Sequence, residues 1–168
     1  MKELLLIRHA KSSWKDDSLS DFDRPLNKRG KKTAPLMGQL LADKHWQPDR
    51  VFASPAIRAK ATAELILPAM AIPPDQVDWH SKLYDASVKA IFNVIKKAPS
   101  ACQRLMIIGH NPSIEETIQA LDPKFNGNIP TCCVTRIRCN ISSWQEINNN
   151  CGEVMDCLRP KEVLVESV

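Results

Sequence analysis

Four polar side chains stand beside short apolar segments in three distant parts of the chain. Arg8 and His9 follow the run LLLI, Arg58 follows VFASPAI, and His110 follows LMIIG. A guanidinium stays protonated and its fork matches two oxygens of a tetrahedral oxyanion, so both arginines suit a phosphoryl group. One neutral imidazole beside them can attack phosphorus, while the second donates to a phosphoryl oxygen. These residue types therefore predict phosphoryl transfer.

The segments that must position these groups alternate between short apolar strands and amphipathic helices. The apolar spacing predicts strands at Leu4–Ile7, Val51–Ala53, Val77–His80 and Leu105–Ile108, and helices at Lys28–Lys44, Ala56–Ile66 (ending before Pro68), Val88–Lys97 and Ser113–Leu121. Such alternation is typical of an α/β three-layer sandwich, in which helices flank a mainly parallel central sheet. Ligands bind at the carboxyl ends of the strands of such sheets, so the four polar groups should converge on one edge.

The last third of the chain has a different pattern. Residues Cys132–Ile141 alternate between apolar and polar side chains, and INNNCGE separates them from Val154–Leu158. This pattern predicts a hairpin-like finish, with at least one antiparallel strand near the C-terminus. We expect a single domain over residues 1–160 and a loose tail over 161–168.

Composition excludes several classes of function. The net charge of +4 is spread along the 168 residues, so composition gives no indication of a nucleic-acid or membrane partner, and we expect neither. No apolar run approaches the roughly 18 residues of a membrane helix, and no signal peptide is evident, so we expect a cytoplasmic protein. The six cysteines show neither CxxC pairs nor zinc-like spacing, which favours free thiols and no metal site.

Separate motifs carry a resemblance to a known family. RHA, SPAIRAKATAE and GHNPS resemble the histidine phosphatase superfamily, also called phosphoglycerate mutase-like or RHG-motif; DFDRPLNKRG, LYDAS and GHNP resemble its SixA-type phosphohistidine phosphatase branch. The motifs keep the family order from about residue 3 to 160. The resemblance implies that His9 is the nucleophile and carries a transient phosphohistidine. It implies that Arg8 and Arg58 bind the phosphoryl group, that His110 completes the pocket, and that no metal or cofactor is needed.

Further site residues follow from the same resemblance. Arg24, in DRPL, matches a position that this branch tends to keep, and is a candidate for phosphate or substrate contact. Lys11 and Ser12 lie in the loop after the nucleophile and are expected to line its mouth. Asp85, in LYD, stands where ester-cleaving relatives place a proton donor. Ala10 departs from the usual motif, which has glycine after the histidine.

The short connections between elements predict a shallow, open site. Such a site admits a phosphorylated side chain of another protein, which favours phosphohistidine on a carrier or signalling protein as the substrate. A phosphatase or mutase for small phosphate esters is the alternative, and would require Asp85 or another carboxyl group as acid. A non-catalytic phosphate-binding module is the third hypothesis, and the intact His9 argues against it.

Overall fold

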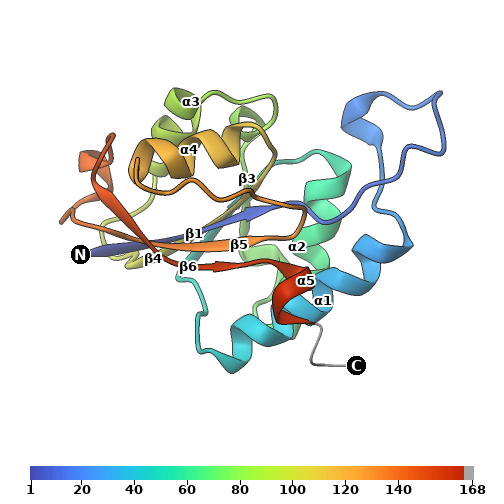
Figure 1. Ribbon diagram of the computed structural model, residues 1–168, viewed down its shortest axis with the longest axis horizontal. Coiled ribbons are helices and arrows are strands. Elements are labelled where there is room, and N and C mark those ends of the chain that lie inside the picture. Colours follow the sequence, from blue (N-terminus) through green and yellow to red (C-terminus); the bar gives the residue numbers. More distant parts are fainter. Residues whose placement is uncertain (165–168) are drawn as a thin grey trace.

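The computed structural model describes residues 1–164, which form one six-stranded sheet with helices on both faces (Figure 1). The sheet order is β3-β2-β4-β1-β5-β6. Its strands are β1 (Lys2–Arg8), β2 (Arg50–Ala53), β3 (Val77–Trp79), β4 (Arg104–Gly109), β5 (Val134–Cys139) and β6 (Gly152–Leu158). The main helices are α1 (Lys28–Asp43), α2 (Ile57–Ala69), α3 (Val88–Ile95), α4 (Ser113–Leu121) and α5 (Pro160–Val163), and short 3-10 helices include η1 (Asp21–Asp23) and η3 (Ser81–Leu83).

Strand pairing confirms the mainly parallel sheet and its antiparallel C-terminal part. Strands β3, β2, β4 and β1 are mutually parallel, β5 is antiparallel to β1, and β6 is antiparallel to β5. Arg8 pairs with Gly109, and Ala53 pairs with Ile108. The carboxyl ends of β1, β2 and β4 therefore meet at one edge of the sheet, as the sequence predicted.

Two hydrophobic cores lie on the two faces of the sheet, which explains the unbroken apolar run of β1. Leu5 and Ile7 pack with α1 and α2, whereas Leu4 and Leu6 pack with α3 and α4. All four side chains are completely buried. A central strand covered on both faces needs apolar residues at every position rather than at alternate ones.

Helix α2 and the C-terminal segment differ from the sequence predictions. Helix α2 continues through Pro68 to Ala69. A proline there removes only one hydrogen bond, to the carbonyl of Glu64, whose exposed position lets water replace the donor. The loose tail predicted from residue 161 begins instead as helix α5, because Val163 and Leu164 pack against the core under α1 and α2. Residues 165–168 lie outside the described part.

Two further observations concern residues 1–164. All six cysteines are free thiols, as expected. None of the described helices is both long enough and apolar enough to cross a membrane.

Candidate active site

His9 lies at the end of β1, where its ring is held in one tautomer. Its backbone N–H donates to the Gly109 carbonyl at 2.9 Å, and the residue is 6% exposed. Nδ1 lies 2.7 Å from the Ala10 carbonyl oxygen, which can only accept, so Nδ1 carries the proton. Arg58 Nε donates toward Nε2 over 3.4 Å. Burial, with the nearby arginines, lowers the pKa of His9 to about 4, which leaves a neutral ring with a lone pair on Nε2.

Arg58 reaches this ring from the first turn of α2. Thr62, one turn later, donates to the Arg58 carbonyl at 2.7 Å and accepts from the Ala10 N–H at 2.9 Å. The threonine therefore joins the start of α2 to the loop after His9. Arg58 is only 5% exposed, so its charge acts on His9 with little screening by water.

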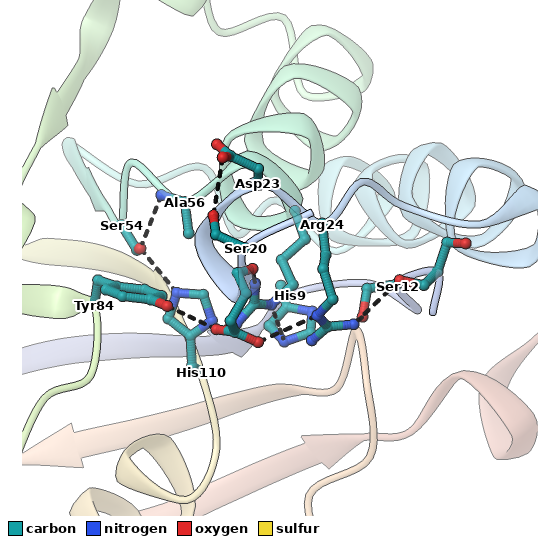
Figure 2. Close-up of polar contacts among 12 residues, drawn as sticks. His9, Ser12, Ser20, Asp23, Arg24, Ser54, Ala56, Tyr84 and His110 are labelled. Carbon is teal, nitrogen blue, oxygen red and sulfur yellow. Dashed lines mark hydrogen bonds and ion pairs between the residues drawn. The ribbon is translucent and has the colours of Figure 1, made fainter. Parts of the chain in front are cut away.

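His110 follows β4, and its ring centroid lies 5.1 Å from that of His9 (Figure 2). Its Nε2 is 2.8 Å from Ser54 Oγ, which already accepts from the Ala56 N–H at 3.2 Å. The serine hydroxyl can also donate its own proton to Nε2, and in that arrangement the His110 proton lies on Nδ1. That nitrogen is buried without a hydrogen-bond partner among the described residues. Burial, with the neighbouring His9 and Arg58, lowers the pKa of His110 to about 3.

Arg24 joins the site from the segment between η1 and α1. Its Nη1 donates to Ser12 Oγ at 2.8 Å, and its guanidinium lies 3.5 Å from the centre of the Trp14 ring. Arg24 is 7% exposed, whereas Trp14 is 74% exposed and forms part of the rim. The structure thus brings Arg24 and Ser12 together with the histidine pair (Figure 2).

Asp21, which was not among the predicted site residues, links Arg58 to Arg24. One carboxylate oxygen accepts from Arg58 Nη2 at 2.9 Å and from the Tyr84 hydroxyl at 2.7 Å, and the other accepts from Arg24 Nε at 3.2 Å. Its backbone carbonyl accepts from Arg58 Nη1 at 2.5 Å. The Tyr84 hydrogen bond, followed by those of the arginines, holds the pKa of Asp21 well below its usual range. An ionised carboxylate therefore occupies the guanidinium edges that suit a phosphoryl group.

Three of the predicted residues, Arg8, Lys11 and Asp85, form no side-chain hydrogen bond with His9, Asp21, Ser54 or the other site residues named above. Arg8 donates from Nη1 to the Ile129 carbonyl at 3.0 Å, and its charge contributes to the lowered pKa of His9. Lys11 is exposed, and its side chain forms no hydrogen bond with the described residues. Asp85 is exposed, has a left-handed backbone (φ 51°), and also lacks a side-chain partner in residues 1–164. Its neighbour Tyr84 reaches the site instead.

Comparison with known proteins matches these features to one family. Residues 4–79 match the model of the histidine phosphatase superfamily (branch 1). An uncharacterized chloroplastic protein of Arabidopsis thaliana is 30% identical over 157 residues, which cover 86% of this chain and 70% of that protein. The chain belongs to the histidine phosphatase superfamily.

Solved structures confirm the SixA-type architecture within this superfamily. A candidate phosphohistidine phosphatase SixA from Agrobacterium tumefaciens has a TM-score of 0.79 and 26% identity, covering 95% of this chain and 98% of that one. The protein histidine phosphatase SixA complexed with tungstate has a TM-score of 0.82 and 19% identity, covering 96% and 99%. The chain is thus a phosphohydrolase of the histidine phosphatase superfamily. Within residues 1–164, no group of three or more His, Cys, Asp or Glu side chains could hold a metal ion.

Proposed function

We propose that this histidine phosphatase removes the phosphoryl group from phosphohistidine on another protein. In the first step, His9 Nε2 forms a bond to phosphorus as the bond from phosphorus to the substrate's imidazole nitrogen breaks. The substrate's ring accepts a solvent proton on its other nitrogen and therefore leaves as neutral imidazole, and the solvent recovers that proton when the product phosphate ionises. In the second step, water attacks the phosphorus on His9, which releases inorganic phosphate and restores the neutral ring.

The main support for this proposal is the protonation state of the carboxyl groups near His9. Cleaving an ester requires a proton donor for the leaving alkoxide, whereas an imidazole leaving group is far less basic. Asp21 supplies a carboxylate to the site, but Arg58, Arg24 and Tyr84 keep it ionised, so it holds no proton to donate near neutral pH. Asp85 is exposed and forms no side-chain hydrogen bond with the other site residues. This arrangement favours a nitrogen leaving group.

The transferring phosphoryl group would meet complementary donors in the site. With Ser54 donating to Nε2, Nδ1 of His110 carries a proton that has no acceptor within residues 1–164, so it can donate to a phosphoryl oxygen. Arg58 and Arg24 can offer their charged edges once the Asp21 carboxylate moves aside. These donors stabilise the charge that develops on the oxygens as the bonds to phosphorus rearrange.

An exposed rim supports a protein as the substrate. Trp14 and the Asp21 carboxylate are 74% and 51% exposed beside the buried histidines. A phosphohistidine on the surface of a folded domain can approach such a rim, and the SixA structure with tungstate is that of a protein histidine phosphatase. We further propose a cytoplasmic location, which the six free thiols support.

The test compares a phosphohistidine peptide with an ester. A histidine peptide phosphorylated by phosphoramidate and an alkyl phosphate ester, O-phosphoserine, are each given to the wild type, to His9→Asn and to His45→Asn. The asparagine amide at residue 9 can keep the hydrogen bond to the Ala10 carbonyl but cannot attack phosphorus. His45 is exposed and has a left-handed backbone (φ 60°), which asparagine tolerates, so His45→Asn is a matched control.

We expect rapid phosphate release from the peptide, slow release from the ester, and loss of both only in His9→Asn. Wild-type protein quenched during turnover should carry a phosphoryl group that is stable in base and labile in acid. Faster turnover of the ester than of the peptide would contradict the proposal and favour a small-ester phosphatase. Release from neither substrate would favour a binding module.

A further inference from the structure

A cavity of about 440 Å³ lies beside the loop that follows His9. His110 and Ser54 follow strands on one side of β1, whereas this cavity borders the start of β5 and the end of β6 on the other side. The charged residues that line it, here called the basic pocket, are Arg8, Lys11, Arg29, Arg159, Lys161 and Glu162. Five of these six side chains are cationic.

One wall of the basic pocket is the packed junction of α1 with the loop after His9. The Asn27 N–H donates to the Lys11 carbonyl at 3.0 Å, and Gly30 lies so close to Lys11 that an added Cβ would overlap its carbonyl oxygen. This contact fixes the start of α1, and with it Arg29, beside the nucleophile loop.

The opposite wall is the segment between α4 and β5 together with the start of α5. Arg159 Nε donates to the Asn128 carbonyl at 3.0 Å, and Gly127 leaves the space that the Arg159 guanidinium fills. The Cys132 N–H lies 2.9 Å from the Arg8 carbonyl oxygen and 3.0 Å from that of His9. The wall of the pocket thus touches the backbone of the nucleophile itself.

The charges of the basic pocket are poorly compensated within the described residues. Glu162 is 61% exposed and pairs only loosely with Arg159, at 3.6 Å. Lys11, Arg29 and Lys161 form no ion pair with any residue of 1–164, and the buried Arg8 Nε has no hydrogen-bond partner there. Like charges held around a cavity repel one another, so an anionic ligand would be attracted strongly.

We propose that the basic pocket binds carboxylate side chains of the phosphorylated protein while its phosphohistidine is held at His9. This inference rests on the proposed function. The exposed ends of Lys11, Arg29 and Lys161 can reach a partner's surface, and complementary charge across an interface raises both the encounter rate and the specificity. The phosphoryl group has Arg58, Arg24 and His110 as partners, and Arg8 lies between His9 and the basic pocket. The remaining cations of the pocket are therefore available to a second anionic group.

Two phosphohistidine peptides test this assignment. They are identical except that one carries three glutamates on each side of the phosphohistidine and the other carries glutamines. The pocket variant is Arg29→Gln with Lys161→Gln, two exposed side chains outside the catalytic group. The charge-matched control is Lys89→Gln with Lys97→Gln, also exposed, on and just after α3, which packs on the other face of the sheet from α1.

We expect the wild type and the control to prefer the glutamate peptide about tenfold in kcat/KM, mainly through KM, since each exposed charge pair contributes at most about fivefold. The preference should fall to about twofold in the pocket variant, and added salt should weaken it in the wild type. An equal preference in wild type and pocket variant would overturn the proposal. A second result would also overturn it: inorganic pyrophosphate binds to the wild type but not to the pocket variant, and the wild type does not discriminate between the two peptides. That result would assign the cavity to a small phosphate ligand.

A turnover-independent measurement separates this proposal from the proposed function. If neither phosphorylated peptide is hydrolysed, the proposed function fails, and the dissociation constants of the unphosphorylated, fluorescently labelled peptides still test the pocket. Tighter binding of the glutamate peptide that is lost only in the pocket variant supports a carboxylate site. Equal binding of both peptides refutes it.

Discussion

Lowering the pH should destabilise the fold through the two histidines of the site. Burial lowers the pKa of His9 to about 4 and that of His110 to about 3, from the ordinary value of 6.5. Between the unfolded and folded values, the unfolded chain binds a proton on each ring that the folded protein excludes. The free energy of unfolding therefore decreases as the pH falls through this window, by about 2 kcal/mol for each histidine between about pH 7.5 and about pH 5.

Urea denaturation followed by tryptophan fluorescence at these two pH values measures the effect. On acidification, the free energy of unfolding of His9→Asn and of His110→Asn should each fall by about 2 kcal/mol less than that of the wild type. His45→Asn should behave as the wild type. Asp21 does not interfere, because its pKa is lowered and its stabilisation is lost only when the pH falls below the ordinary carboxyl value of 3.8. An equal loss in the wild type and both site variants would refute the reasoning.

Four other substitutions test separate parts of the structure. Asp21→Asn removes the carboxylate that occupies both arginines and should raise the affinity for vanadate about fivefold in a titration; a decrease would mean that the carboxylate mainly holds the arginines in place. Arg58→Lys should lower kcat/KM on a phosphohistidine peptide about 100-fold, because an ammonium cannot contact Asp21 and His9 together; a loss below fivefold would contradict this. Asp85→Asn should leave that rate within about twofold, whereas a tenfold loss would make Asp85 a proton donor. Gly30→Ala should cost about 2 kcal/mol in urea denaturation, because its Cβ would overlap the Lys11 carbonyl, and an unchanged midpoint would disprove that contact.

The regular elements of the fold were predictable because the faces that they bury leave a recognisable apolar pattern in the sequence. The LLLI run of β1 is covered on both faces, and its unbroken apolar character indicated a central strand. The rule that ligands bind at strand ends then grouped His9 and His110 before any geometry was known. The extent of α2 was less predictable, since the cost of Pro68 depends on whether water reaches the Glu64 carbonyl, which is a property of the packed structure.

Asp21 could not be assigned in the same way because a segment without regular structure delivers it. The three residues of η1 have no hydrophobic period, and the spacing of Asp21 from Arg24 indicates only a local ion pair of little value. Its contact with Arg58 spans 37 residues, and its contact with Tyr84 spans 63. Those contacts change what the carboxylate does. Beside one exposed arginine it would be a surface charge, but between two buried guanidiniums it is, under the proposed function, the anion that a phosphoryl group displaces.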